Sequence, residues 1–211
     1  MADKPGLRER KRQRTHQTIS AAAIALFLER GYDSVSIAEI ADAAEVSRRT
    51  LFAYFPTKDD LVLHRFADHE DEPARTVRDR APDQTPLDAL HDQRRQALLA
   101  RDPITGINDT PEIVAFYDLV LATPALRSAL LRFTIRSRDT LSAALRDTTT
   151  DEHQGTAPLA AAQIVVVHQT LSEANHLRVV AGHSADELEP LALAELEQAY
   201  AMLRGGLYPY R

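Results

Sequence analysis

The sequence predicts an all-α protein of nine to ten helices, with a small three-helix N-terminal domain followed by a larger helical body. Two observations support this fold class. Apolar residues recur at spacings of three and four along most of the 211-residue chain, and no stretch alternates for long between apolar and polar residues. Helix-start signals, a hydroxyl residue followed by proline or by an acidic residue three positions on, recur between these segments.

A first helix is expected from Thr15 to Arg30. Its apolar residues form one stripe, and Gly31 follows in the position that commonly ends a helix. Ahead of it, residues 1–14 hold six Lys and Arg against two Asp and Glu, so we expect a flexible basic arm that is disordered when free. The arm is either a solvated tail or a segment whose basic side chains follow phosphates or enter a minor groove. These side chains are Arg8, Arg10, Lys11, Arg12 and Arg14.

The stretch from Ser36 to Lys58 indicates two short helices joined by a tight turn. Ser36 is expected to cap the first, with Glu39 completing a capping box, and Ser47 opens the second, which Pro56 stops. On the second helix Leu51, Phe52 and Phe55 are apolar, while Arg48, Arg49, Thr50, Ala53 and Tyr54 form a compact, mostly polar face. The expected core residues of this domain are Phe27, Ile40, Leu51 and Phe55. Such a pair of helices is typical of a DNA-binding helix-turn-helix.

The rest of the chain predicts a linking helix and five more helices. The linking helix begins with a capping pair, Thr57 and Asp60, and runs to about Asp71 or Arg80, with Pro73 as a kink or stop. The later helices are expected at 86–101, 111–121, 124–147, 158–181 and from a capping box at Ser184 and Glu187 to about Arg204, unless Pro190 marks the start of the last one; a loop is expected at 147–157.

Charge and composition narrow the class of protein. The net charge is −6, but residues 1–66 carry +2 and the remainder −8, which suits a protein that meets DNA with one end only. The lack of cysteine excludes disulfides and thiolate metal sites, and no apolar run reaches the roughly 18 residues of a spanning helix. Because the N-terminus also lacks the apolar segment of a signal peptide, we expect a cytoplasmic protein.

The segment from about Thr15 to Leu63 resembles the N-terminal domain of TetR-family transcriptional regulators. The residues that carry the resemblance are Ala-Ile-Ala-Leu-Phe at 23–27, Gly31-Tyr32, Ile40-Ala41, Val46-Ser47, Thr50-Leu51-Phe52, Tyr54-Phe55, Lys58 and Leu61. One position departs from the family pattern: Glu45 stands where glycine is usual, and a left-handed backbone there costs a non-glycine residue roughly 1 kcal/mol.

The resemblance implies a ligand-responsive, sequence-specific regulator of transcription, most simply a repressor that a small molecule releases from its DNA operator. It implies a homodimer and a link between head and body rigid enough to transmit motion. We expect no cofactor. We therefore divide the chain into a flexible basic arm (1–14), a helix-turn-helix DNA-binding domain (15–58) and a helical effector-binding and dimerisation domain (59–211).

The DNA interface is the strongest site prediction. Arg48 and Arg49 begin the second motif helix, where side chains meet base edges, and arginine pairs with guanine through two hydrogen bonds. Thr50 and Ala53 are expected to touch bases or thymine methyl groups. Phosphate contacts are expected at Ser36, Ser47, Tyr54, Lys58, Arg12 and Arg14, of which Ser36, Tyr54 and Lys58 follow from the resemblance.

Two further sites follow from the resemblance. The last two long helices are expected to pair with those of a second chain as a four-helix bundle, through Ile164, Val167, Leu171 and Leu191, unless these residues are ordinary core. The effector pocket is expected within the body, and its candidate residues are Phe66, His69, Phe116, Tyr117, Phe133, Arg136, His168 and His176. This mix suggests an apolar small molecule with one anionic or hydrogen-bonding group.

Catalysis and metal binding have little support. His64 and Asp68 are four residues apart and lie near His69, but no third ligand is spaced to join them, and an HExxH motif, a glycine-rich phosphate loop and a nucleophile elbow are absent. We therefore expect neither an enzyme nor a metal site. The alternative is a helical small-molecule-binding or metal-dependent enzyme domain that carries a vestigial DNA-binding head.

Overall fold

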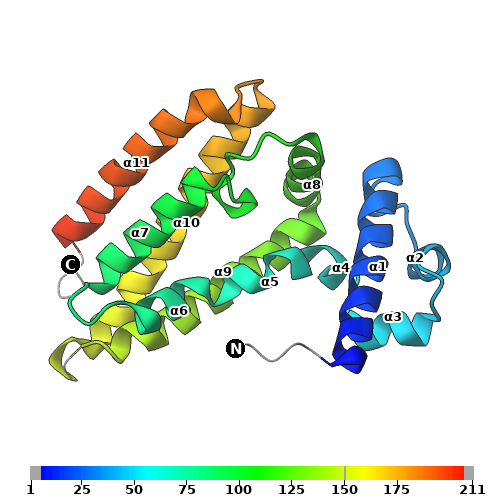
Figure 1. Cartoon of the computed structure of the whole chain (residues 1–211), viewed down its shortest axis with the longest axis horizontal. Coiled ribbons are helices and arrows are strands. Elements are labelled where there is room, and N and C mark those ends of the chain that lie inside the picture. Colours follow the sequence, from blue (N-terminus) through cyan, green and yellow to red (C-terminus); the bar gives the residue numbers. More distant parts are fainter. Residues whose placement is uncertain (1–5, 150, 207–211) are drawn as a thin grey trace. The chain divides into compact units, whose positions relative to one another are not determined.

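The computed structural model describes residues 6–149 and 151–206, and within these ranges it contains helices and connecting segments but no strand (Figure 1). The α-helices are α1 (Leu7–Arg30), α2 (Ile37–Ala43), α3 (Arg48–Tyr54), α4 (Asp60–Leu63), α5 (Ala67–Glu70), α6 (Glu72–Asp79), α7 (Pro86–Leu99), α8 (Pro111–Ala122), α9 (Pro124–Arg146), α10 (Ala157–Val180) and α11 (Ala185–Gly206). The 3-10 helices are η1 (His64–Phe66), η2 (Pro103–Thr105) and η3 (Asp151–Thr156). With α4, η1 and α5 counted as one bent helix, the described residues form ten α-helical elements, and the predicted all-α fold class is confirmed.

The chain folds into two compact units. The first comprises residues 1–65 and 115–129, and the second comprises residues 66–114 and 130–211. Helices α8 and α9 therefore each contribute residues to both units, and the boundary after Arg65 falls inside η1. The domain boundary expected at residue 58 stays a prediction.

Helix α1 is longer than predicted. It begins at Leu7, so residues 7–14 are helical and the expectation of a disordered arm is wrong for them; residues 1–5 of that arm lie outside the described residues. The reason is that Leu, Arg, Glu, Lys and Gln are good helix formers and no Gly or Pro interrupts the segment. A helix held by its packed C-terminal half therefore extends to Gly6. Gly31 ends α1 as expected, with φ of +83° and its N–H donating to the Phe27 carbonyl at 2.9 Å.

The core of the first unit lies where α1 packs against α2 and α4. The four predicted core residues, Phe27, Ile40, Leu51 and Phe55, are confirmed, because each is at most 1% exposed. Ser20 on α1 donates a hydrogen bond to the Leu61 carbonyl at 3.2 Å, which ties the first helix to α4. This core supports the two short helices of the motif.

The predicted linking helix is interrupted twice. Helix α4 passes into the 3-10 turn η1 at His64–Phe66, and α5 ends at Glu70 before α6 begins. Pro73 explains the second break, because proline is tolerated in the first turn of a helix but not in its interior. The first break contains no proline, and a 3-10 segment between helical turns often marks a hinge.

The later helices follow the predicted bounds closely. Thr85 caps α7 by accepting a hydrogen bond from the Asp88 N–H at 3.1 Å, and the capping box before α11 is present, with Ser184 N–H donating to Glu187 at 3.0 Å. Two details differ. The expected loop at 147–157 contains η3, and Pro190 lies inside α11 instead of at its start.

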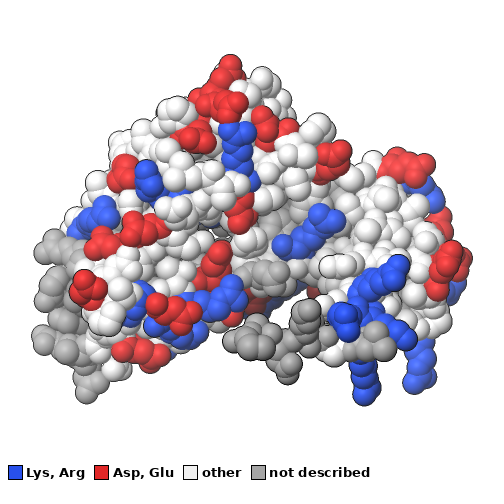
Figure 2. Space-filling model, viewed as in Figure 1, with Lys and Arg blue, Asp and Glu red and all other residues white. Residues whose placement is uncertain are grey.

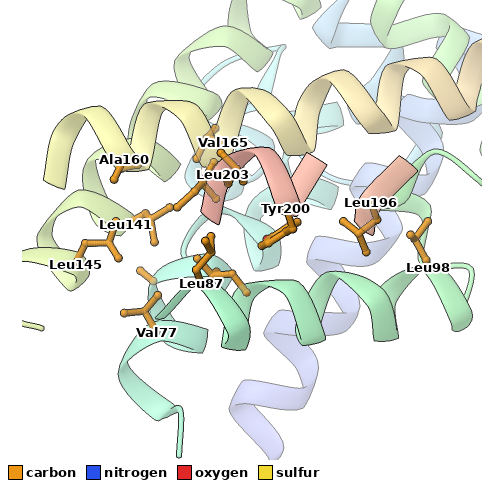
Figure 3. Packing of buried hydrophobic residues seen from close by; sticks show 14 of the residues in the cluster. Val77, Leu87, Leu98, Leu141, Leu145, Ala160, Val165, Leu196, Tyr200 and Leu203 are labelled. Atoms are coloured by element: carbon orange, nitrogen blue, oxygen red, sulfur yellow. The ribbon is translucent and has the colours of Figure 1, made fainter. Parts of the chain in front are cut away.

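The core of the second unit is formed by α6, α7, α9, α10 and α11, whose apolar side chains converge (Figure 3). Tyr200 and Leu196 of α11 point toward α7, where Leu87 is fully buried. Alanines at 160, 161 and 192 belong to the same cluster, and their small side chains let α10 and α11 pack closely within one chain.

Among the described residues, no individual helix has both the length and the apolar character needed to cross a membrane. Helices α8 and α9 reach those limits only as a pair, and they are bent by 94° at the break between them.

Candidate nucleic-acid interface

The start of α2 is held by the predicted capping box. Ser36 Oγ accepts a hydrogen bond from the Glu39 N–H at 3.3 Å, and Glu39 Oε2 accepts one from the Ser36 N–H at 2.8 Å. Arg30, the last residue of α1, donates to Glu39 Oε1 at 2.7 Å. The Ser36 backbone hydrogen bond, then the Ser36 hydroxyl and Arg30, lower the pKa of Glu39 to about 2. Helix α2 is therefore fixed to α1 and to its own cap.

The turn between α2 and α3 has a left-handed residue. Glu45 has φ of +53° and is exposed, and the following Val46 N–H donates to the Ala41 carbonyl at 2.9 Å. The position where the family usually has glycine thus does require the backbone conformation that glycine adopts most easily. A glutamate there costs roughly 1 kcal/mol.

Helix α3 presents one face to solvent and one to the core. Ser47 caps it by accepting a hydrogen bond from the Thr50 N–H at 3.0 Å, as predicted, and Leu51 anchors it with 0% exposure. Thr50 and Tyr54 are half-buried. The exposed residues are Arg48, Arg49, Phe52 and Ala53. Three of the four predicted base-contacting residues therefore lie on the free face of α3.

Phe52 is not where the sequence analysis grouped it. The sequence pattern groups it with the apolar Leu51 and Phe55, but its side chain is 47% exposed. The reason is the helical geometry: Phe52 is three and four residues from Arg49 and Arg48, so it shares their face. The missed signal was this spacing.

Lys58 faces inward. Its ammonium donates to the Tyr32 carbonyl at 2.5 Å and lies 4.2 Å from the centre of the Tyr32 ring and 5.3 Å from that of Phe27. Burial lowers the pKa of Lys58. Tyr32 in turn donates to Asp59 at 2.5 Å, and burial followed by this hydrogen bond raises the pKa of Tyr32. Lys58 thus stabilises the junction of α1 and α4, and its phosphate contact stays a prediction.

A histidine pair lies behind α3. The ring of His16 on α1 is centred 4.3 Å from Phe55 and 4.8 Å from His64, and 6.3 Å from Tyr54. Burial lowers the pKa of His16, with Arg12 adding to the effect. Burial, then the nearby His16 and Arg65, lower the pKa of His64 to about 4. The pair fixes the C-terminal end of α3 against α1.

The basic side chains of the first unit gather at one end. Arg12 and Arg14 are exposed on α1 within about one turn of His16, which contacts the end of α3. In Figure 2 the Lys and Arg side chains of this unit cluster over α3 and the N-terminal half of α1, and the acidic ones lie over α2 and the other end of α1. Two separate helices thus contribute to one basic surface.

The second unit contains a polar cluster centred on Arg94, which was not among the predicted site residues, although its neighbour His168 was. Arg94 on α7 is 6% exposed and donates to the carbonyls of Ile104, at 3.1 Å, and His168, at 3.4 Å, and to the Ser172 hydroxyl. His168 Nε2 lies 2.7 Å from the Tyr200 hydroxyl, and burial lowers the pKa of His168 well below its usual value. Arg94 falls on the buried stripe of α7, three and four residues from buried positions, which was the available signal.

The predicted effector residues are divided between the units. Phe116 and Tyr117 belong to the first unit, where the Arg65 guanidinium lies 5.4 Å from the Phe116 ring. The other six, Phe66, His69, Phe133, Arg136, His168 and His176, belong to the second unit. Among them the rings of Phe66 and Phe133 are 6.0 Å apart, His69 lies 2.9 Å from Glu72, and Arg136 pairs with Glu70 at 2.7 Å on an exposed surface.

The predicted dimer residues face different ways. Ile164 is 1% exposed and part of the chain's own core, and Val167 and Leu171 pack against that core, so the interface prediction is wrong for Ile164. Leu191 is 44% exposed. The predicted stripe follows the inward face of α10. The outward stripe of α10 is Leu159, Gln163, Val166, Thr170, Glu173, Leu177 and Val180, all exposed, at alternating spacings of four and three.

The described part of the chain holds no group of three or more His, Cys, Asp or Glu side chains arranged to bind a metal ion. His64 Nδ1 instead lies 3.4 Å from the Ser20 hydroxyl. His69 pairs with Glu72, as described above.

Comparisons with known proteins agree with this geometry. Residues 19–64 match the model of the bacterial regulatory proteins of the tetR family. The HTH-type transcriptional regulator TcmR of Streptomyces glaucescens is 32% identical over 130 residues, which are 61% of this chain and 57% of TcmR. The chain thus matches little more than half the length of that relative.

Two solved structures have a similar fold. NalD of Pseudomonas aeruginosa superposes with a TM-score of 0.57 at 19% identity, over 90% of this chain and 97% of NalD. The SmeT–triclosan complex gives a TM-score of 0.56 at 17% identity, over 90% of each chain. At these identities the similarity concerns the fold.

A three-helix unit that exposes a basic second motif helix defines a helix-turn-helix protein of the DNA-binding class. The family match identifies this part of the chain. Residues 19–64 form the DNA-binding domain of the TetR family of bacterial regulatory proteins.

Proposed function

We propose that this protein is a homodimeric regulator of transcription, most simply a repressor, which binds an operator through α3 and leaves it when a small molecule binds the body. The observation that carries the proposal is the exposed basic face of α3, whose opposite face is anchored by Leu51. A regulator of bacterial operators works on chromosomal DNA, so its compartment is the cytoplasm.

In this proposal Arg48 and Arg49 read guanines in the major groove, and Thr50 and Ala53 lie against neighbouring bases. Ser36 and Ser47 contact phosphates through their hydroxyl groups. The Ser36 oxygen accepts a capping hydrogen bond while its own O–H can donate, and the Ser47 hydroxyl accepts the corresponding bond and lies 2.8 Å from the Thr50 hydroxyl, with which it can share a phosphate. Arg12 and Arg14 add phosphate contacts, and Tyr54 and Lys58 extend them at the far end of α3.

The relatives support a response to small molecules. NalD is described as the secondary repressor of a multidrug efflux pump, and SmeT was solved with triclosan bound. By analogy, the second unit binds an effector of modest size among residues such as Phe66, Phe133, His69 and His168. A coupling of about 1–3 kcal/mol between effector and operator is enough for substantial release. We propose that the 3-10 turn η1 is the hinge through which a change caused by the effector reaches α4.

The outward faces of α10 and α11 form the proposed dimer interface. Large apolar side chains there are exposed in the single chain: Leu159 (66%), Val166 (57%), Leu177 (65%), Val180 (50%), Leu191 (44%) and Met202 (74%). One reading helix covers only a few base pairs, whereas a two-fold pair reads half-sites about one turn apart. The stripe of α10 therefore replaces Ile164 as the proposed contact.

DNA binding is tested with the duplex upstream of the protein's own gene, by fluorescence anisotropy at fixed salt. We expect Arg48→Ala with Arg49→Ala to abolish sequence-specific binding, a loss of at least about 30-fold, because two guanine contacts of about 1–3 kcal/mol each disappear. The matched control is Arg78→Ala with Arg95→Ala, which removes two exposed arginines from the second unit. Unchanged selectivity in the α3 variant would show that the reading face is wrong.

Dimerisation is tested by light scattering at micromolar concentration. We expect Val166→Glu with Leu177→Glu to yield a folded monomer with weakened operator binding. Leu131→Glu is the control, because Leu131 is 58% exposed on α9, outside the proposed interface. A wild-type monomer, or equal disruption by the control, contradicts the proposed interface.

The effector is sought by a thermal-shift screen of small molecules followed by anisotropy on the DNA complex. Compounds that raise Tm and also release DNA support the proposal. Stabilisation by cationic compounds alone contradicts the expected apolar molecule with an anionic or hydrogen-bonding group.

A further inference from the structure

We propose that Phe52 is a specificity-determining residue that reads thymine, through contact of its phenyl ring with the C5 methyl group in the major groove. This inference rests on the proposed DNA-binding function and adds a base contact that the sequence analysis did not assign.

Phe52 is only about half covered by the rest of the unit. Its side chain is 47% exposed, whereas the flanking Leu51 and Phe55 are 0% and 1% exposed and anchor α3. The ring of His16 is centred 4.3 Å from that of Phe55 and 6.3 Å from that of Tyr54. The phenyl ring of Phe52 therefore projects from α3 with half its surface in water.

Phe52 has two arginines and an alanine as exposed neighbours on α3. Phe52 lies one helical turn from Arg48 and Arg49, so all three side chains share one face of α3. Ala53 is the fourth exposed residue of the helix. An apolar ring between two arginines and an alanine is thus part of the surface that the proposed function places in the major groove.

The chemistry of the phenyl ring limits which groups of DNA Phe52 can contact. A phenyl ring carries no hydrogen-bond donor or acceptor, so it cannot pair with a phosphate or with the polar edge of a base. Among the groups that base pairs present in the major groove, the C5 methyl of thymine is the apolar one, and phenylalanine is among the side chains that contact it. Covering the ring with that methyl group removes apolar surface of both from water. The expected half-site has thymine next to the guanines read by the arginines.

The experiment uses operators that the full-length wild-type protein selects from randomised duplexes. Each thymine of a selected half-site is replaced in turn by deoxyuridine, which lacks the methyl group but pairs identically, and Kd is measured by anisotropy at fixed salt. For wild-type protein we expect one or two replacements to weaken binding about three- to five-fold each, the effect of exposing about one methyl group. For Phe52→Ala the same replacements should change Kd less than 1.5-fold, about the error of such a comparison.

Two further variants sharpen the result. Phe52→Leu keeps an apolar side chain and should retain most of the thymine preference. Leu28→Ala removes another exposed apolar residue of the same unit, 42% exposed and about 18 Å along α1 from His16, and should leave the preference unchanged. Circular dichroism melts confirm that each variant is folded.

The outcomes separate the two proposals. If the wild-type protein selects no sequence, the proposed function fails, and this inference fails with it. If it selects an operator but deoxyuridine affects wild type and Phe52→Ala equally, DNA binding stands and the role of Phe52 is refuted. Loss of affinity in Phe52→Ala without any deoxyuridine effect means that the ring packs on the sugar backbone, and this also refutes thymine reading.

Discussion

The two units bury different kinds of side chain. In the first unit, the buried polar residues among those described are Ser20 and Thr123, and the rest of the core is apolar. In the second unit they are His91, Arg94, Thr105, Ser137, Ser142, Asn175 and His176. Apart from Lys58, which faces inward, the basic side chains described above for the first unit lie at its surface, where a phosphate backbone can meet them. The body keeps polar groups inside, where hydrogen bonds must compensate their burial.

The two units should tolerate substitutions to different degrees. An apolar core accepts substitutions of similar volume. A polar interior specifies one arrangement, and the loss of one hydrogen-bonding partner leaves a buried polar group unsatisfied, which lowers stability. We therefore expect disruptive substitutions to lower the free energy of unfolding more in the second unit than in the first.

Gly106→Ala should destabilise the protein most. Gly106 has φ of +75°, and a Cβ there would lie 2.0 Å from the Ser172 carbonyl oxygen on α10. Backbone strain and the overlap together are expected to lower the free energy of unfolding by about 3–4 kcal/mol. Urea denaturation followed by circular dichroism measures it.

Gly182→Ala is the matched control for Gly106→Ala. Gly182 also has a positive φ, of +98°, but a Cβ there meets nothing within 4 Å. It should cost only the strain, about 1 kcal/mol. Equal losses in the two variants would mean that the close approach to α10 is unimportant.

Arg94→Met should rank second. The variant keeps the length of the side chain but removes the donors to the Ile104 and His168 carbonyls and the Ser172 hydroxyl, with an expected loss of about 2–3 kcal/mol. Arg95→Met, at the adjacent exposed position, should change stability by less than about 0.5 kcal/mol. A double variant with Ser172→Ala should lose less than the sum if the two residues act together.

The stability of the first unit should depend moderately on pH. The folded pKa of His64, about 4, is below the ordinary value of 6.5, so the unfolded chain binds a proton first as the pH falls. Stability should therefore decrease between pH 6.5 and 4 and stay unaffected by this group above pH 7. Since solvent reaches the half-buried ring, the slope should be below the roughly 1.4 kcal/mol per pH unit of one fully linked proton. His64→Gln should flatten the slope; an unchanged slope contradicts the assignment.

Glu45→Gly should have the smallest effect, and it should be favourable. Glycine relieves the left-handed strain at φ of +53° but gains entropy in the unfolded chain, so we expect a stabilisation of up to about 1 kcal/mol. Removing a negative charge from the turn before α3 should also strengthen DNA binding slightly at low salt. A loss of stability would show that the Glu45 side chain makes a contact that supports the turn.

Local signals made most of the fold predictable. The capping box of Ser36 and Glu39, the cap at Ser47 and the proline-marked starts of α7 to α9 depend on residues at most four apart, which the sequence displays directly. The core of the head followed from the same spacing. The fold class needed no long-range information, because helices are local structures.

The sequence did not predict which side of a helix would be covered by the rest of the protein. Ile164 and Val166 are equally apolar, but only Ile164 enters the core, because the position of α11 decides which stripe of α10 is buried. The same holds for Phe52, and for Arg94, whose partners lie about 10 and 78 residues away in sequence. Spacing defines faces, and tertiary packing chooses between them.

The unbroken run of α1 from Leu7 decides how its arginines can meet a duplex. A helix with its side chains is about 10–12 Å across, wider than the roughly 6 Å opening of a minor groove, so a rigid cylinder must remain outside it. Arg8, Lys11 and Arg12 share one face of this helix, so they would then contact phosphates along the edge of the groove and add affinity that does not depend on sequence and that salt weakens steeply.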